Sequence, residues 1–494
     1  MQPAKSSAVA LTGAMILGLG IIGPGSTSAP AAVVAEAGTS RSASPGSEGL
    51  GDRLVPGLGN GGYRVDHYHL KMVYQPKLKV VRGTVTIRAR ATKPLTRFNL
   101  DFDGRSVTSV RIDRKRAGFV REGAEVVMTP TRPIGRGDRF TARVRYVAEP
   151  AARTSCRIPD LPADSAWFVT RTGFFTSAQP GCAHTIFPVN DHPSDPATYS
   201  FAITVPAGLT AVTNGVATGK RRHGARTTWR YRQREPMASE LIQIVVGKYR
   251  VLRGVGPHGL PLRSVIMDGK VRETQSAVRA IPEQIRWMER RVGRYPFATY
   301  GILGTPRFPS ALETQTLSVF DVATLTGGPK RWSGVAMHEL AHQWFGNSVM
   351  PRRWSDLWLN EGHATWYEYT YSEDLGELSL TRAMKKAYRQ SNSWRSEFGP
   401  PARPARFSTI FSPNVYDGGA LVLYALRQKV GDRTFRQIER AWVTRNRHQV
   451  ARTSDYVNLS SRIAGRDLHR FLNRWLYGAT VPPMPGHPRW RSGA

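Results

Sequence analysis

The sequence predicts an α+β protein in which an all-β N-terminal domain precedes a mainly helical domain. Between residues 61 and 250, short alternating apolar and polar segments are separated by Pro, Gly and Asp turns, which is typical of half-buried strands. From residue 251 onward helical periodicity dominates, and an H-E-x-x-H motif lies inside this second part. The 494 residues are enough for two or three domains.

The first 37 residues are expected to be a secretory signal peptide. Lys5 precedes an apolar run over residues 8–22, and an Ala-Glu-Ala cleavage pattern ends at residue 37. This predicts a secreted, extracellular protein. An uncleaved anchor is the alternative, although a membrane span takes ~20 apolar residues and this run is shorter. No second stretch approaches that length, so we expect no membrane span in the mature chain.

The segments that follow divide into a linker and a strongly basic β domain. Residues 38–60 are rich in Ser, Gly, Pro and Ala and are expected to be disordered. Residues 85–90 and 140–145 alternate apolar side chains with Thr and Arg, so the arginines face solvent. The net charge of +34 is therefore mainly a solvated surface, which should attract anionic polymers such as cell-wall or envelope phosphates. No nucleic-acid-binding motif is present, and nucleic acid is not an expected partner.

The chain contains two cysteines, Cys156 and Cys182, and neither has other potential metal ligands at a suitable spacing in the sequence. In an exported protein we expect them to form one disulfide, closing a loop of about 25 residues and contributing roughly 3 kcal/mol. Two buried free thiols are the alternative.

The most informative motif is H-E-x-x-H at residues 338–342. His338 and His342 lie four residues apart, so on a helix both imidazoles project from one face toward a single ion. Glu361 is far enough along the chain to lie on a second helix and to complete the ligand set. Two imidazoles and one carboxylate with an open fourth position are a catalytic zinc arrangement. Glu339 is not needed as a ligand, so it is the expected base for the attacking water.

At this point the sequence resembles the gluzincin aminopeptidases, the family of aminopeptidase N and leukotriene hydrolase. Residues 335–349 and 354–365 are similar to that family's zinc helix and third-ligand helix. The resemblance runs from about residue 63 to about residue 485 and implies one Zn²⁺ per chain.

The resemblance also implies a domain organisation. Residues 61–250 should form the family's saddle-shaped β domain, and residues 251–480 a thermolysin-like catalytic domain. Residues 481–494 are expected to be a tail. Many relatives continue into a helical-repeat domain above the active site, and we expect no such domain here, which leaves a more open cleft.

Two further segments are similar to the family's substrate-binding motifs. Residues 310–316 match its G-A-M-E-N segment and keep Ala311 and Glu313. In the family this segment is an edge strand that pairs with the substrate, and the glutamate holds the substrate's free α-amine. An internal peptide offers no ammonium, so amine capture implies an exopeptidase. The match over residues 176–193 implies that Gln179 lines the amine pocket.

Residues 415–420 are expected to form a glycine-rich loop and are similar to the family's Y-x-K-G-A segment. The resemblance implies that Tyr416 donates a hydrogen bond to the oxyanion of the tetrahedral intermediate, while Gly418 replaces the family's lysine. His363 lies two residues beyond Glu361, so a helix directs it about 200° away, and we expect it not to bind the metal. Glu368 is nearly on the face of Glu361 and is a candidate hydrogen-bond partner for a ligand histidine.

Together these observations predict an exported zinc-dependent aminopeptidase acting on peptides with a free N-terminus. A metallo-endopeptidase on the same scaffold would share the zinc residues without needing Glu313. A catalytically idle, basic surface-binding protein is the alternative from another class, although it would not need intact ligands, base and tyrosine. Epoxide hydrolysis, suggested weakly by His363, is less favoured.

Overall fold

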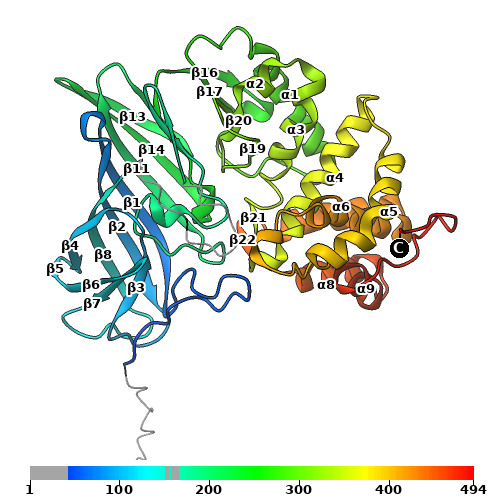
Figure 1. The fold of residues 1–494 in the computed structure, drawn as a ribbon, viewed down its shortest axis with the longest axis horizontal. Helices are drawn as coiled ribbons and strands as arrows, with labels where there is room; N and C mark the ends of the chain where they lie inside the picture. The colour runs from blue at the N-terminus through cyan, green and yellow to red at the C-terminus, as the bar shows by residue number, and fades with distance from the viewer. Residues whose placement is uncertain (1–42, 151–155, 157–165, 494) are drawn as a thin grey trace, which may run out of the picture. The chain divides into compact units, whose positions relative to one another are not determined.

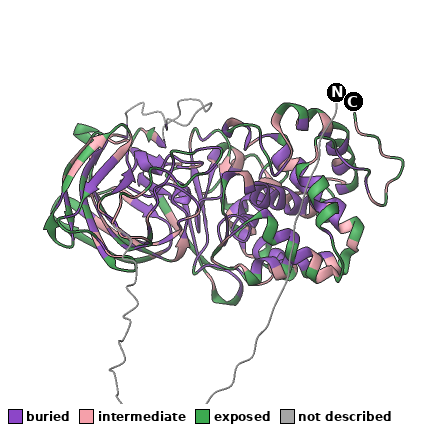
Figure 2. Cartoon of the chain, turned by 90° about the horizontal axis from the view of Figure 1, so that it is seen from below, coloured by how far each residue is buried: buried purple, intermediate pink, exposed green. Residues whose placement is uncertain are grey.

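In the computed structural model, which describes residues 43–150, 156 and 166–493, a β-rich half is followed by a mainly helical half (Figure 1). Buried residues run through both halves (Figure 2). Across the described residues, the helices are all too short or too polar to cross a membrane. The predicted α+β class and the order of its parts are confirmed. The predicted signal peptide, residues 1–37, lies outside the described residues.

An eight-stranded sheet forms the base of the β half. The strand order is β13-β14-β11-β1-β2-β8-β4-β5, with β1 and β11 parallel and the other neighbours antiparallel. The strands are β1 (Tyr63–Gln75), β2 (Val80–Ala91), β4 (Ser106–Ile112), β5 (Lys115–Arg116), β8 (Arg139–Ala148), β11 (Ala197–Pro206), β13 (Val216–His223) and β14 (Arg226–Met237). On β2, Val85 and Ile87 are buried whereas Arg88 and Arg90 are exposed, so the predicted alternation is confirmed.

Two smaller sheets pack on this one. The first has the order β3-β7-β6 and the second β12-β15-β10-β9. Their strands are β3 (Phe98–Asp101), β6 (Gly118–Glu122), β7 (Glu125–Thr129), β9 (Trp167–Thr170), β10 (Gly173–Thr176), β12 (Thr210–Thr213) and β15 (Ile244–Gly247). From β1, the Tyr63 ring meets Phe98 with centroids 5.5 Å apart, and the Tyr74 ring meets Phe174 at 5.2 Å. These edge-to-face aromatic contacts join the three sheets into one core.

The expectation that residues 38–60 are a disordered linker is wrong for the part that the structure describes, residues 43–60. Leu54 and Val55 are buried in the core, and the Asp52 side chain accepts a hydrogen bond from the backbone N–H of Trp354 (2.8 Å). A Ser/Gly/Pro-rich composition suggested too little apolar surface to order this segment. A few buried apolar and hydrogen-bonding groups are enough to hold it.

The helical half begins with a five-stranded sheet of order β16-β17-β18-β20-β19. Its strands are β16 (Tyr249–Val255), β17 (Pro261–Met267), β18 (Ile302–Thr305), β19 (Ala311–Leu312) and β20 (Ser318–Asp321), and β21 (Val349–Pro351) pairs separately with β22 (Gln449–Ala451). The helices are α1 (Gln275–Val292), α2 (Val322–Thr326), α3 (Pro329–Ala341), α4 (Trp358–Asp374), α5 (Leu380–Phe398), α6 (Pro413–Val430), α7 (Asp432–Arg445), α8 (Thr453–Ala464) and α9 (His469–Tyr477). β15 ends and β16 begins on either side of Lys248, close to the expected domain boundary.

The expected C-terminal tail packs against this helical half. The Trp490 ring stacks on Tyr424 of α6 with centroids 5.9 Å apart, and the Tyr424 hydroxyl lies 2.7 Å from His487 Nε2. Residues 481–493 therefore cover part of α6.

Helices α4 and α6 approach each other at a pair of glycines. A Cβ atom placed on Gly362 would lie 2.8 Å from the Cα of Gly419, and a Cβ on Gly419 would lie 2.8 Å from the Cα of Gly362. Real Cβ contacts are not this short, so each glycine is required by the other. Gly362 follows Glu361 directly and Gly419 lies three residues after Tyr416. The contact therefore sets how far apart these two functional side chains lie.

Replacing Gly419→Ala should cost about 1–3 kcal/mol of stability, because backbone atoms of α4 and α6 must separate to admit one methyl group. Urea unfolding followed by tryptophan fluorescence measures the effect. Gly219→Ala is the matched control, because a Cβ at this exposed position meets nothing within 4 Å. Equal unfolding midpoints for both variants would contradict the role given to the glycine pair.

Candidate metal centre

The two histidines of the motif meet Glu361 at the end of α3. His338 lies in the last turn of α3 and His342 caps it, while Glu361 lies in the first turn of α4. The Glu361 Oε2 atom is 3.4 Å from His338 Nε2 and 3.3 Å from His342 Nε2. All three side chains are buried. The structure thus brings together the three ligands that the sequence singles out.

The donor atoms fit a tetrahedral ion. Zinc bonds to histidine nitrogen and carboxylate oxygen are about 2.0–2.1 Å, so the edges of a tetrahedral site are roughly 3.3–3.4 Å long. The two nitrogen–oxygen distances of 3.4 and 3.3 Å match this edge length. The residues present therefore suit a Zn²⁺ ion.

Each ligand histidine is oriented by a bond from its other nitrogen. His338 Nδ1 lies 2.9 Å from Glu368 Oε2, and His342 Nδ1 lies 3.1 Å from the carbonyl oxygen of Phe345. Both acceptors favour a proton on Nδ1, so Nε2 is the nitrogen that faces Glu361 and that, once it has lost its own proton, offers a lone pair to a metal ion. Glu368 is the partner that helical spacing suggested, whereas the Phe345 carbonyl has no sequence signal.

The carboxylates of the site differ in their proton affinity. Burial opposes ionisation of Glu361, but the positive fields of His342 and His338 and their hydrogen bonds lower its pKa to about 2. Burial raises the pKa of Glu339 to about 8. Glu339 Oε2 has no hydrogen-bond partner among the described residues. Glu361 therefore stays ionised and suits a cation, whereas Glu339 can hold a proton near neutral pH and so can exchange one.

Glu313 follows the edge strand β19 and is held from two sides. Its carbonyl oxygen accepts hydrogen bonds from Gln343 Nε2 (3.0 Å) and Asn347 Nδ2 (2.6 Å), which lie just beyond His342. Its side-chain Oε1 accepts a 2.6 Å bond from Gln179 Nε2 of the β half. Gln343 and Asn347 are functional residues that sequence reasoning missed, and the only signal was their closeness to the zinc motif.

Strand β19 lies at the edge of its sheet, as the resemblance implied for this segment. Ala311 of β19 pairs with Phe320 of β20, and among the described residues no strand lies on the other side of β19. Atoms of Glu313, Glu339 and His342 also lie within 4.8 Å of one another. The Glu313 carboxylate is therefore next to two residues of the H-E-x-x-H motif.

Tyr416 lies on the first turns of α6, not in a glycine-rich loop. Its ring stacks on that of His338 with centroids 5.9 Å apart. Burial raises the pKa of Tyr416 well above its ordinary value, and the negative charges of Glu361 and Glu313 add to this. The phenol consequently keeps its proton and can donate it in a hydrogen bond.

His363 points away from the ligand cluster. Its ring stacks on Phe345 with centroids 4.4 Å apart, and its Nε2 is 3.4 Å from Glu439 Oε1. Glu439 also accepts hydrogen bonds from the hydroxyls of Tyr367 (3.1 Å) and Tyr456 (2.8 Å). His363 is thus part of a buried polar cluster behind α4.

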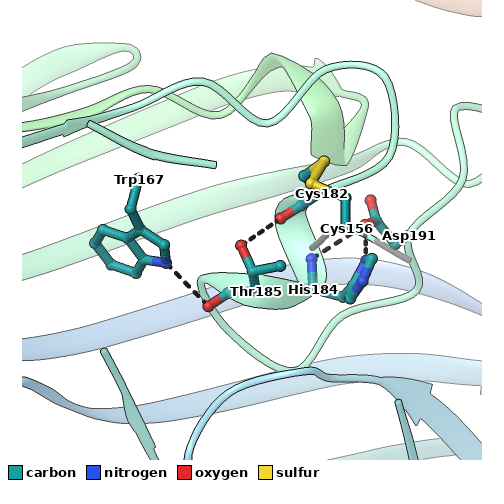
Figure 3. The surroundings of a disulfide bond; sticks show 6 residues. All are labelled: Cys156, Trp167, Cys182, His184, Thr185 and Asp191. Carbon is teal, nitrogen blue, oxygen red and sulfur yellow. Dashed lines mark hydrogen bonds and ion pairs between the residues drawn. A yellow bond between two sulfur atoms is a disulfide. The ribbon is translucent and has the colours of Figure 1, made fainter. Parts of the chain in front are cut away.

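A disulfide supports the turn that carries Gln179. Cys156 is bonded to Cys182 (Figure 3). The Cys182 N–H donates to the carbonyl of Ala178 (2.7 Å). In the following turn, Thr185 Oγ1 donates to the Cys182 carbonyl (2.8 Å). The link fixes the backbone three residues after Gln179, which keeps this side chain directed at Glu313.

Comparison with known proteins identifies the family. Residues 64–241 match the peptidase M1 N-terminal domain, and residues 277–475 match the peptidase family M1 domain. The M1 zinc metallopeptidase of Deinococcus radiodurans is 30% identical, with a TM-score of 0.78 over 88% of this chain and 99% of that one. A variant bound to the substrate Tyr-Ser-Ala is also 30% identical, with a TM-score of 0.78 over 89% of this chain and 100% of that one. The chain belongs to peptidase family M1, the zinc metallopeptidases, and its cofactor is Zn²⁺.

Curated relatives are longer than this chain. Aminopeptidase M1 of Arabidopsis thaliana is 26% identical over 61% of this chain, and leukotriene A-4 hydrolase of Xenopus laevis is 23% identical over 75%. The matches span 36% and 63% of those proteins, respectively.

Replacing Glu368→Gln should weaken zinc binding about 10–100-fold, because the amide is a poorer acceptor for His338 Nδ1–H. Competition with a chromogenic chelator measures the affinity directly, independent of turnover. Glu397→Gln, at an exposed position on α5, is the control and should leave the affinity unchanged. Equal affinities for the two variants would remove Glu368 from the metal centre.

Proposed function

We propose that this protein is an exported zinc aminopeptidase that removes the N-terminal residue from peptides with a free amine. The observation that carries the proposal is the closeness of Glu313 to Glu339 and His342, within 4.8 Å. In a peptide, the amine nitrogen lies only about 2.5 Å from the carbonyl carbon of its own residue. A carboxylate so near the metal ligands therefore leaves room for one residue between the captured amine and the bond to be cut.

The side chains divide the chemistry among them. His338, His342 and Glu361 hold Zn²⁺, which when bound polarises the scissile carbonyl and makes water more acidic. Glu339 takes a proton from the attacking water and returns it to the leaving nitrogen.

Two further groups act on the substrate itself. The Tyr416 hydroxyl donates a hydrogen bond to the carbonyl oxygen as negative charge develops there. Glu313 accepts a hydrogen bond from the substrate ammonium, and Gln179 donates a hydrogen bond to the same carboxylate. The Deinococcus relative that holds Tyr-Ser-Ala supports a peptide as the substrate.

Release of a fluorophore from free-amine aminoacyl amides, run beside N-acetylated copies, tests the function. We expect cleavage of the free-amine set alone, abolished by a zinc chelator and restored by Zn²⁺. Cleavage of the acetylated set would instead indicate the endopeptidase. In the same assay Glu339→Gln should lower kcat about 10²–10⁴-fold while zinc content stays the same. A zinc-loaded, fully active Glu339→Gln variant would contradict the assignment of the base.

Export is supported by the leader-like pattern in residues 1–37 and by the bond between Cys156 and Cys182, since disulfides persist in oxidising compartments.

We also propose that the outer face of the eight-stranded sheet binds anionic polymers of the cell envelope. Seven exposed arginines lie on three adjacent strands of this face: Arg82, Arg88, Arg90, Arg111, Arg139, Arg143 and Arg145. Arg143 lies directly between Thr86 and Arg111 in the register, and Arg139 lies opposite Arg90. Arginines and hydroxyls in this pattern suit phosphate groups.

Binding to inorganic polyphosphate at 50 and 200 mM salt tests this surface. Changing Arg88, Arg111 and Arg143 together to Gln should weaken binding at least tenfold and flatten its salt dependence, because fewer counterions are released. The control changes three exposed helix arginines, Arg433, Arg470 and Arg474, to Gln. Equal losses in the two triple variants would assign binding to net charge and not to this face.

A further inference from the structure

Glu240 is a buried acid that the proposed mechanism does not use. It lies on a 3-10 turn, η3 (Ser239–Leu241), between β14 and β15, and only 3% of its surface is exposed. Its Oε2 atom has no hydrogen-bond partner among the residues that the structure describes. Burying a carboxylate oxygen without a partner is costly, because nothing replaces the water it loses. Such an atom in a folded protein calls for a functional explanation.

The backbone on both sides of Glu240 is fastened to the segment that follows β19. Gln315 Nε2 donates to the carbonyl of Pro236 (3.1 Å). Asn214 Nδ2 donates both to the carbonyl of Leu241 (2.9 Å) and to that of Gln315 (2.7 Å). η3 therefore lies beside the segment that carries the amine-binding carboxylate.

The surroundings of Glu240 are locally acidic in a chain of net charge +34. Burial, together with the negative charges of Asp191 and Glu313, raises the pKa of Glu240 to about 8. Glu339 lies close to Glu313 as well. A cation brought to this place would relieve the repulsion among the acids and stabilise the ionised form of Glu240.

We propose that Glu240 determines substrate specificity by binding the cationic side chain of a Lys or Arg at the N-terminus of the peptide. This rests on the aminopeptidase function proposed above. Glu313 fixes the substrate amine, and the side chain of the same residue leaves from the adjoining Cα. The long apolar stem of Lys or Arg then carries its charged end to the second carboxylate, where it supplies the partner that Oε2 lacks. A Leu or Met side chain cannot do this.

The test compares kcat/KM for Arg, Lys, Leu and Met aminoacyl amides in the wild type and in Glu240→Gln. We expect the wild type to favour Arg and Lys, and the variant to lower the Arg-to-Leu ratio about tenfold or more, with Leu and Met nearly unchanged. The ratio is insensitive to partial unfolding, which lowers all four rates equally. Glu125→Gln, which alters a carboxylate bonded to Asn60 in the β half, is the matched control and should keep the wild-type ratio.

Three results would overturn the inference. The first is an unchanged Arg-to-Leu ratio in Glu240→Gln. The second is an equal loss on all four substrates, which would assign Glu240 to amine binding or to folding. The third is a change of the same size in Glu125→Gln. By contrast, a zinc-loaded wild type that cleaves none of the free-amine substrates would defeat the aminopeptidase proposal itself, so the two failures are distinct.

Discussion

Two hydrogen bonds to a single carbonyl oxygen join the metal centre to the segment that follows β19. Gln343 and Asn347 both donate to the carbonyl of Glu313; Gln343 follows His342 directly, and Asn347 lies five residues after His342. Gln343 Oε1 also accepts from the backbone N–H of Thr316 (2.9 Å). The end of the zinc helix is thereby fixed to the segment that follows β19. Without this link, the metal ligands and the Glu313 carboxylate would belong to separate elements with no fixed spacing between them.

The rest of the site is arranged around that link by close packing. On α4, three consecutive residues serve different neighbours: Glu361 faces the histidines, Gly362 admits α6, and His363 stacks on Phe345. The β half contributes Gln179 to Glu313 through a turn fixed by Cys182. Both halves of the protein therefore place side chains at Glu313.

The sequence was informative where the chemistry is local. The spacing of His338 and His342 fixes one helical face, and the alternation on β2 identifies its buried side, because both patterns follow from backbone geometry. The hydrogen bond between Gln343 and Glu313 joins segments thirty residues apart, and no periodic pattern in the sequence predicts it. The glycines near Tyr416 led to a different wrong prediction. They suggested a loop, but the segment is part of α6, and the packing of that helix requires Gly419. The composition of residues 43–60 likewise led to a wrong prediction of disorder. A few buried contacts are enough to order a segment whose average composition is polar.

The contact between Asp52 and Trp354 has a consequence for when the protein can become active. Asp52 is almost fully buried, and the next residue, Arg53, donates to the carbonyl of Pro404 (2.7 Å). These bonds connect residues more than three hundred positions apart. Contacts of such separation form late, after most of the chain is available. A growing chain therefore lacks this brace, which lies beside the third-ligand helix, until residues 354 and 404 have both been added.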